Sequence, residues 1–485
     1  MTVTSAIRRW IPCLRAMALA FVFAAAACTP GGNAGGPAVS GADVSTAASR
    51  PPELRDVALR GYGGLYVEGP APAYLEAVGR RIAAANDLGE WRFTMVDSPA
   101  PNAFTIGTRE VFVARGLLAV LQDEAELASV VGHEMAHVVA GHRAQRAAQR
   151  AQALSSVVQV ARNTRDPQLA SAMAMMELTR LQAYSREHEF EADRIAIRLI
   201  AKAGYDPDAA ASALRRILAY EGFAAREAGR TAADPGRGAQ LDSHPRTVDR
   251  VEAARREIGG AAGGRREAEA YLAATDGLLF GDSPREGFAR GRRFVHPQLG
   301  FAFDAPAGYR LLNGPRAVLA VGPTGSGMVF TCVARAPEGA TTDAMRRLYP
   351  NINLVDAREL RVNGMEAATA VAGRAAGAGD SEMRVVAIRY DGSICTFRMV
   401  WTGSGGAELL QAAQTFRRLS ASDAAMARPL RLRVVDVAPG ESTRSLAART
   451  PFDDGVRRER FELINGLDGG ENVAAGRRVR VVVAE

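Results

Sequence analysis

The chain has 485 residues, of which 47% are hydrophobic and 23% are charged. This length exceeds what one core accommodates, so two to four folded domains are expected, and large-scale disorder is not. The formal net charge is +7, carried almost entirely by arginines scattered along the chain. No basic run is interleaved with aromatic residues, so the composition argues against nucleic acid as a partner.

The first 28 residues have the pattern of a secretory signal. Basic residues precede an apolar run from 16 to 27, which is too short to span a bilayer comfortably but has the length of a signal-peptide core. The run ends in Ala-Ala-Ala-Cys28, which resembles a bacterial lipobox and predicts lipidation of Cys28. Because Ala25 stands where a lipobox usually has Leu, cleavage nearby by an ordinary signal peptidase remains an alternative.

Residues 29–52 are rich in Gly, Pro, Ser and Ala, as a flexible linker between a membrane and a domain would be. Thr29 after the cysteine matches the usual sorting pattern for the outer membrane. The expected location is therefore the periplasm, with the chain anchored to the outer membrane as a lipoprotein.

Residues 53–258 are expected to form one α-rich domain. Apolar spacing and turn residues predict helices and short strands in this order: a helix over 72–85, strands over 91–96, 102–107 and 110–113, a helix over 124–142, and a helix over 178–203. Asp123 and Glu126 have the spacing of a capping box at the start of the 124–142 helix. Gly204 is expected to end the 178–203 helix, and Asp206-Pro207 to start the next one.

The segment His133-Glu134-Met135-Ala136-His137 has the HExxH pattern. On a helix, positions i and i+4 share one face, so both imidazoles can reach one Zn²⁺ ion. Glu134 lies beside them and is expected to activate the attacking water. Only six histidines occur in the chain, which makes a chance match improbable.

A catalytic zinc needs a third protein ligand, and helix geometry selects it among neighbouring acids. Glu189 and Asp193 share an otherwise apolar helix face, whereas Glu187 and Glu191 lie on a charged face expected to be solvated. A buried carboxylate must be paired or bound to metal, so Glu189 is the predicted ligand. Asp193 is expected to accept the free N–H of a liganding histidine. His142 and His188 fall off these faces and are expected to be solvated.

HExxH followed by Glu-x-x-x-Asp after Ser185-Arg186 resembles the M48 family of zinc metallopeptidases, in its soluble periplasmic, BepA-like branch. Further matching segments begin at Asn102, Gly116 and Ala203, and the resemblance covers about residues 53 to 258. It implies a zinc metalloendopeptidase with one Zn²⁺ per chain.

The same resemblance implies roles for residues outside the metal ligands. His244 in Ser-His-Pro would either stabilise the oxyanion or coordinate the metal as an inhibitory ligand, and a structural role remains open. The strand formed by Val111, Phe112 and Val113 would pair with an extended substrate. Asn102 and Arg250 would assist substrate binding.

The insertion at 143–184 is rich in Ala, Gln and Met. Its methionines could form an adaptable lid for unfolded polypeptide, but a Met stripe of this kind is more often core, and that interpretation is favoured.

The segments after residue 258 differ in pattern. Residues 259–289 are expected to be a linker, 290–420 an α/β accessory domain and 428–485 a βααβ module that resembles LysM, which suggests contact with peptidoglycan. Cys332 and Cys395 lie in predicted strands, where either a disulfide or two buried thiols would fit. The fold class is therefore α+β and multidomain, with a mainly α-helical zincin-type peptidase domain that contains a small β-sheet.

The leading functional prediction is a zinc endopeptidase of the cell envelope that degrades misfolded or unassembled proteins. The alternative is a lipoprotein chaperone or assembly factor for outer-membrane proteins with a largely latent zinc site. An intact Glu134 favours the enzyme, because a scaffold has no need of that carboxylate.

Overall fold

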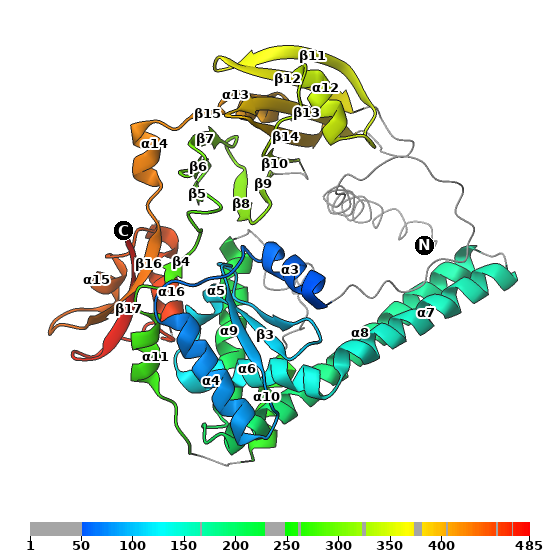
Figure 1. Ribbon diagram of the computed structural model, residues 1–485. Coiled ribbons are helices and arrows are strands. Elements are labelled where there is room, and N and C mark those ends of the chain that lie inside the picture. The colour runs from blue at the N-terminus through cyan, green and yellow to red at the C-terminus, as the bar shows by residue number, and fades with distance from the viewer. Residues whose placement is uncertain are drawn as a thin grey trace, which may run out of the picture. The chain divides into compact units, whose positions relative to one another are not determined.

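The computed structural model describes residues 51–164, 167–227, 248–259, 263–322, 326–372, 381–403, 406–452, 454–467 and 469–485. The signal segment with Cys28 and the segment with His244 lie outside these residues. The described chain divides into two compact units (Figure 1). The larger unit comprises Pro51–Phe303, Asn313–Ala317 and Arg417–Glu485, and the smaller comprises Asp304–Leu312 and Val318–Phe416.

The larger unit begins with two helices, α3 (Pro51–Gly61) and α4 (Ala71–Ala85), followed by a small sheet. Its strands are β1 (Arg92–Val96), β2 (Ala103–Thr105) and β3 (Glu110–Ala114). The order is β1-β3-β2, with β3 parallel to β1 and antiparallel to β2. β3 is therefore the middle strand, which explains why all of its residues are buried.

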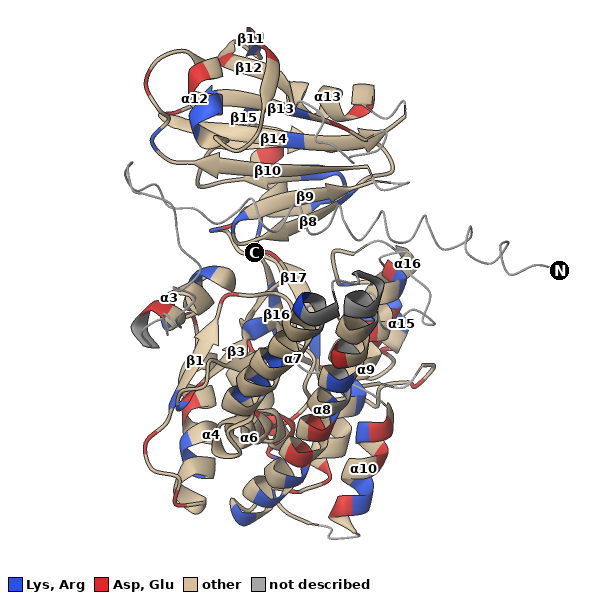
Figure 2. Ribbon diagram, turned by 90° about the vertical axis from the view of Figure 1, so that its right-hand side faces the viewer, with Lys and Arg blue, Asp and Glu red and all other residues tan. Residues whose placement is uncertain are grey.

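Helices make up most of the rest of this part. They are α5 (Arg115–Leu118), α6 (Glu124–Val139), α7 (His142–Thr164), α8 (Pro167–Lys202), α9 (Ala209–Glu227), α10 (Val248–Ile258) and α11 (Ala268–Thr275). The α7 and α8 helices pack against each other as a long antiparallel hairpin (Figure 1). Figure 2 shows basic and acidic segments mixed along α8 and α10, in agreement with the scattered charge of the sequence.

The ends of α6 show how local sequence shapes the fold. Asp123 accepts a hydrogen bond of 2.8 Å from the Glu126 N–H, so the predicted N-cap is confirmed. The Glu126 carboxylate turns instead to the Gln122 N–H at 2.7 Å. The helix ends three residues earlier than predicted, because Gly141 adopts a φ of +70° that reverses the chain before His142.

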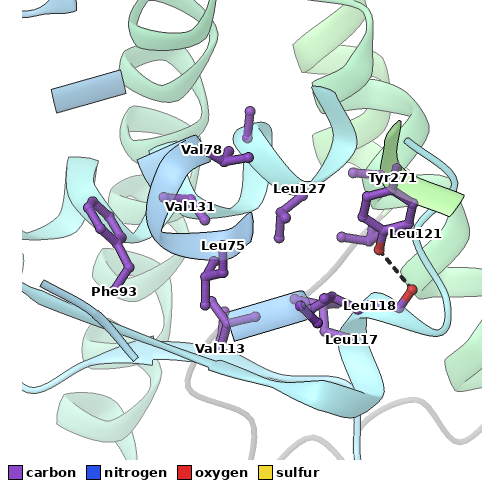
Figure 3. Packing of buried hydrophobic residues seen from close by; sticks show 14 of the residues in the cluster. Leu75, Val78, Phe93, Val113, Leu117, Leu118, Leu121, Leu127, Val131 and Tyr271 are labelled. Carbon is purple, nitrogen blue, oxygen red and sulfur yellow. Dashed lines mark hydrogen bonds between the residues drawn. The ribbon is translucent and has the colours of Figure 1, made fainter. Parts of the chain in front are cut away.

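The core of the larger unit packs α4 and α6 onto the small sheet (Figure 3). Leu75 and Val78 of α4 meet Leu127 and Val131 of α6 in one buried cluster. The Tyr271 hydroxyl extends this cluster by donating to the Leu118 carbonyl at 2.7 Å. The HExxH helix is therefore held by a close-packed core on one side.

The C-terminal segment has the predicted βααβ order. It comprises β16 (Leu430–Asp436), α15 (Thr443–Ala447), α16 (Asp454–Ile464) and β17 (Arg478–Ala484). The sheet order is β17-β16-β4, with β4 (Leu279–Phe280) as a short third strand.

Buried Arg480 joins this segment to the N-terminal, mainly helical part of the larger unit. Its guanidinium donates to the carbonyls of Leu118 at 3.0 Å and Leu121 at 2.9 Å, and also to that of Ile464. Leu432, Ile464 and Val482 enter the same hydrophobic cluster as α4 and α6.

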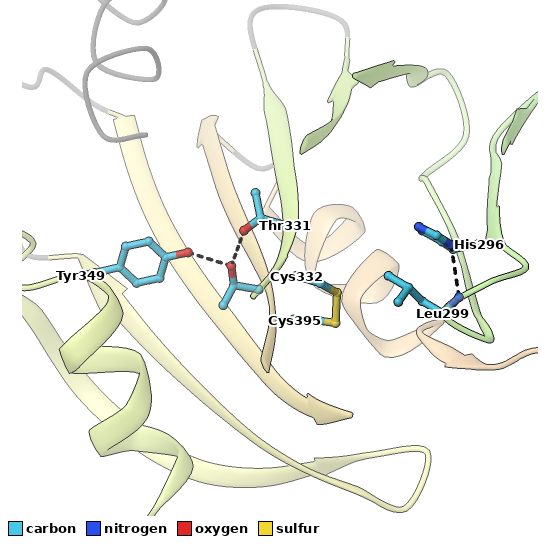
Figure 4. The surroundings of a disulfide bond; sticks show 7 residues. His296, Leu299, Thr331, Cys332, Tyr349 and Cys395 are labelled. Atoms are coloured by element: carbon cyan, nitrogen blue, oxygen red, sulfur yellow. Dashed lines mark hydrogen bonds between the residues drawn. A yellow bond between two sulfur atoms is a disulfide. The ribbon is translucent and has the colours of Figure 1, made fainter. Parts of the chain in front are cut away.

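A second small sheet completes the larger unit, in the order β15-β7-β6-β5. Its strands and the adjoining helix are β5 (Phe288–Arg290), β6 (Arg293–His296), β7 (Phe301–Asp304), β15 (Arg417–Arg418) and α14 (Ala421–Met426). His296 of β6 is 8% exposed, and its Nδ1 accepts from the Leu299 N–H at 3.3 Å (Figure 4).

The smaller unit is built on a sheet in the order β11-β12-β13-β14-β10-β9-β8. Its elements are β8 (Arg310–Gly314), β9 (Ala317–Val321), β10 (Gly327–Val333), α12 (Thr341–Leu348), β11 (Leu354–Val362), β12 (Met365–Ala372), β13 (Ser381–Tyr390), β14 (Ser393–Thr402) and α13 (Gly406–Gln414). Cys332 and Cys395 lie opposite each other on β10 and β14 and form a disulfide (Figure 4).

The chain is thus a mixed α/β, multidomain protein, as the sequence predicts. The finer domain boundaries remain a prediction. Within the described ranges, no helix combines the length and the apolar character needed to cross a membrane.

Candidate metal centre

The α6 and α8 helices bring three metal-binding side chains together. The Nε2 atoms of His133 and His137 are 3.0 Å apart. The carboxylate of Glu189 lies 3.3 Å from His133 Nε2 and 3.5 Å from His137 Nε2. One donor atom from each residue lies within 4.8 Å of the others. The three residues predicted as ligands therefore form one convergent group.

Gly132 allows the close approach of the two helices that carry these ligands. A Cβ at this position would lie 3.3 Å from Ile200 Cγ2 and 3.7 Å from Ala196, both on α8. A larger residue immediately before His133 would push α8 and its Glu189 away from α6.

The two faces predicted for α8 are confirmed by their exposure. Glu189 and Asp193 are 1% and 7% exposed, in line with the buried Ala196, Ile197 and Ile200. The opposite face, with residues Glu187, Glu191, Arg194 and Arg198, is exposed.

Asp193 supports His133 from the side away from the donor cluster. Its Oδ1 lies 3.0 Å from His133 Nδ1. Arg250 on α10 donates two hydrogen bonds of 2.7 Å to the same carboxylate and lies 3.1 Å from Glu189 Oε2. Burial alone would raise the pKa of Asp193, but Arg250 outweighs it and lowers the pKa overall.

The electrostatics of the cluster favour a cation. Burial lowers the pKa of His133, but hydrogen bonds with Asp193 and Glu189 outweigh it and raise the pKa to about 9. The same carboxylates that stabilise an imidazolium would stabilise a divalent cation at the Nε2 atoms.

His142 and His188 are buried, at 0% and 3% exposure, so the expectation that they are solvated is wrong. His142 Nδ1 lies 2.8 Å from His137 Nδ1, and its Nε2 lies 3.3 Å from Glu191 Oε2. The His142 ring stacks on His188, with centroids 4.1 Å apart and planes at 9°. The sequence did not predict this contact, because residues 124–142 were expected to form one helix. The chain instead reverses at Gly141 and returns His142 toward His137.

Glu134 is 2% exposed and borders a cavity of about 40 Å³ between α6, α8, α9 and β2. The other walls are mostly small or aliphatic, and they include residues Ala103, Val130, Ala196, Ala213, Leu214 and Ile217. The Glu134 carboxylate thus stands at the edge of a mostly apolar space.

Three residues predicted to pair with substrate do not lie on an edge strand. Val111, Phe112 and Val113 belong to β3, which is hydrogen-bonded on both sides, so they have no edge to offer a substrate. β2 is the edge strand on this side of the sheet, and Ala103 of β2 borders the cavity.

The other two candidates for substrate binding, Asn102 and Arg250, have partners within the protein. Asn102 donates to the Tyr62 hydroxyl at 3.2 Å. Arg250 is 3% exposed and paired with Asp193 and Glu189, and it also lines the cavity beside Glu134, so its role in substrate binding stays a prediction.

The α7–α8 hairpin does not bury its methionines as a core would. Met175 and Met176 are 65% and 59% exposed, and Leu154 on α7 is 66% exposed. The interpretation of this insertion as core is therefore wrong for these side chains. Arg146, one turn after His142, donates to Glu189 Oε1 at 3.2 Å. The base of the α7–α8 hairpin therefore contacts the candidate metal site.

The donor set fits zinc. Two imidazoles and one carboxylate are a ligand set of catalytic zinc sites that leave a fourth position open. Ligand atoms about 2.1 Å from a tetrahedral ion lie about 3.4 Å from one another. The observed separations of 3.0, 3.3 and 3.5 Å agree with that spacing.

This part of the chain is similar to known proteins. Residues 71–258 match the model of peptidase family M48. Mitochondrial metalloendopeptidase OMA1 of Schizosaccharomyces pombe is 34% identical over 155 residues, which are 32% of this chain and 46% of that protein. The beta-barrel assembly-enhancing protease of Escherichia coli is 27% identical over 179 residues, 35% of this chain and 37% of that protein. The putative beta-barrel assembly-enhancing protease of Vibrio cholerae is 34% identical over 147 residues, which are 28% of this chain and 30% of that protein.

The chain spans less than half the length of these relatives. The convergent donors, Glu134 and Asp193 all lie inside the matched range. Residues 71–258 of the chain are therefore similar to peptidase family M48.

Proposed function

We propose that the protein is a zinc-dependent metalloendopeptidase of the bacterial envelope that cleaves misfolded or unassembled proteins. One observation carries this proposal: His133, His137 and Glu189 converge while Glu134 lies beside them at an apolar cavity. The relatives named metalloendopeptidase and assembly-enhancing protease support the same reaction and setting.

Zinc bound by these three residues would polarise the scissile carbonyl and lower the pKa of the attacking water. Glu134 then acts as the general base, taking a proton from that water and passing it to the leaving amine. Asp193 and Arg250 hold His133 in orientation during these steps. Burial of Glu134 excludes bulk water from the carboxylate that moves the proton.

The substrate would add to the β2 edge as an extended strand. The Asn102 carbonyl accepts from the Ala114 N–H at 2.9 Å. In an antiparallel pair of strands, the residues that hydrogen-bond to the partner strand alternate with residues that do not. The backbone N–H and C=O groups of Ala103 and Thr105 therefore point away from β3. A chain paired with those groups would pass Glu134, with one side chain over the cavity bordered by Ala103.

Lipidation at Cys28 would hold the enzyme at the outer membrane, close to unassembled envelope proteins. The βααβ module is proposed to contact peptidoglycan, on the basis of its resemblance to LysM and its observed element order. Nucleic acid has no part in this function.

A Glu134→Gln variant tests the reaction directly. It keeps the size of the side chain but removes the base, so cleavage of an unfolded protein substrate should fall at least 100-fold, on the order of a lost general base. Unchanged cleavage would contradict the proposed mechanism. His133→Ala is the matched metal control, and bound zinc in that variant would contradict the ligand assignment.

The alternative chaperone function finds support in the exposed apolar side chains of the α7–α8 hairpin, which could hold unfolded clients. The Glu134→Gln variant separates the two functions in cells. Full rescue of a deletion strain without cleavage would favour the chaperone, whereas loss of rescue would favour the peptidase.

A further inference from the structure

We propose that His142 is the positioning residue of the metal ligand His137, and that it fixes the ligand's tautomer through a chain of hydrogen bonds that ends at Glu191. This inference rests on the proposed zinc site. The observations that carry it are the burial of His142 and the contacts made by its two ring nitrogens.

The protons in this chain can be placed from chemistry alone. His137 Nε2 points at His133 Nε2 and Glu189, so it is the nitrogen that must stay unprotonated to bind a metal. A neutral His137 therefore carries its proton on Nδ1, and it donates that proton across the 2.8 Å contact with His142 Nδ1. A neutral His142 then carries its own proton on Nε2, which faces Glu191 Oε2 at 3.3 Å.

The ring of His142 has a fixed orientation. It stacks on the His188 ring, and Tyr184 makes an edge-to-face contact with His188, with centroids 4.1 Å apart and planes at 63°. His188 Nε2 lies 3.0 Å from Gln145 Oε1, which anchors the second ring in turn. His142 is thus held by packing at its face and by hydrogen bonds at both nitrogens, as a residue that orients another must be.

The two histidine ligands consequently have different supports. His133 faces the carboxylate of Asp193, whereas His137 faces the imidazole of His142. Outer partners of this kind set the orientation of a ligating ring, and their loss typically lowers metal affinity about 10–100-fold.

The test compares two variants of similar size in the full chain. In His142→Asn the side-chain oxygen can still accept a hydrogen bond from His137 Nδ1–H. In His142→Leu the side chain has no acceptor for that hydrogen bond. Zinc affinity, measured by competition with a chromogenic chelator, should fall about 10–100-fold in His142→Leu. It should stay within a few-fold of wild type in His142→Asn. His188→Phe keeps the stacking surface and serves as the control for packing.

A second measurement needs no metal. The chain has six histidines, so long-range ¹H–¹⁵N spectra of the imidazoles contain few signals. A slowly exchanging Nδ1–H of His137 should be present in wild type and His142→Asn and lost in His142→Leu.

The outcomes distinguish a failure of the positioning role from a failure of the proposed zinc site. Equal zinc affinity in His142→Leu and wild type, or equal losses in the two His142 variants, would overturn the positioning role. A wild-type protein that binds no zinc would instead overturn the metal site, and the Nδ1–H signal of metal-free protein would still decide whether His142 accepts from His137.

Discussion

Arg250 donates two hydrogen bonds of 2.7 Å to Asp193, and that carboxylate in turn contacts His133, a proposed metal ligand. Asp193 lies 3.0 Å from His133 Nδ1, so three side chains from α6, α8 and α10 form one chain of contacts. Both partners of the ion pair are buried, which makes the pair sensitive to the loss of either side.

Arg250→Met should lower the free energy of unfolding of the metal-free protein by about 3–5 kcal/mol, because it leaves the buried Asp193 without its guanidinium partner. Urea unfolding measures this change. Arg256→Met on the same helix removes an exposed arginine 3.9 Å from Glu252 and should cost less than about 1 kcal/mol. Equal effects of the two substitutions would show that the buried pair has no special role.

Thr105→Pro tests whether β2 binds substrate as an added strand. Proline removes the N–H that Thr105 turns away from β3, so kcat/KM for an extended peptide should fall about 2–10-fold, the worth of one hydrogen bond. Thr105→Val keeps that N–H and removes only the hydroxyl that contacts Thr108 and Gly107, so it is the control. An equal loss in both variants would argue that the hydroxyl, not the edge, is responsible.

Arg480→Met should destabilise the larger unit by about 2–4 kcal/mol, because the carbonyls of Leu118, Leu121 and Ile464 lose their donor. Thermal unfolding of the full chain measures this change. Arg478→Met, two residues earlier on β17, removes a partly exposed partner of Glu269 and should cost less than about 1 kcal/mol. If Arg480→Met melted like wild type, the C-terminal segment would not depend on this anchor.

His296 predicts a pH dependence of stability. Burial lowers its pKa from 6.5 to about 4, so as the pH falls below 6.5 the unfolded chain takes up a proton that the folded chain resists. The free energy of unfolding contains this full contribution above pH 6.5 and loses it as the pH falls toward 4. At pH 5 the free energy of unfolding should be about 2 kcal/mol lower than at pH 7.5 on account of His296.

The His296→Gln variant isolates this contribution. Its amide oxygen can still accept from the Leu299 N–H but does not titrate, so its unfolding free energy should fall less than that of wild type between pH 7.5 and pH 5. Parallel pH profiles for the two proteins would refute the assignment.

Local patterns predicted that the residues of the candidate metal centre converge, because they report on single helices. The spacing of His133 and His137 places both on one face of α6, and the apolar stripe of α8 distinguishes buried Glu189 from exposed Glu187. Two helices between residues 53 and 258, α4 and α6, were predicted to within three residues, because caps and periodicity are properties of contiguous sequence. The α8 helix starts at Pro167 instead of 178, since its first turns are part of the hairpin with α7, and α3, α5, α7 and α10 were not predicted.

Strand pairing could not be predicted in the same way. Both β2 and β3 have apolar side chains, and sequence alone does not show which of them is hydrogen-bonded on two sides. The parallel pairing of β1 with β3 makes β3 the middle strand, and this pairing depends on how the whole sheet packs on α4 and α6.

The sequence by itself predicted the candidate zinc ligands and the candidate base, because both predictions follow from residue type and helical spacing. Only the tertiary structure decided what surrounds them. The reversal at Gly141 returns His142 to His137, and α10 brings Arg250 to Asp193 from 57 residues away. Contacts between distant segments depend on the packing of the whole core, and no local pattern encodes them.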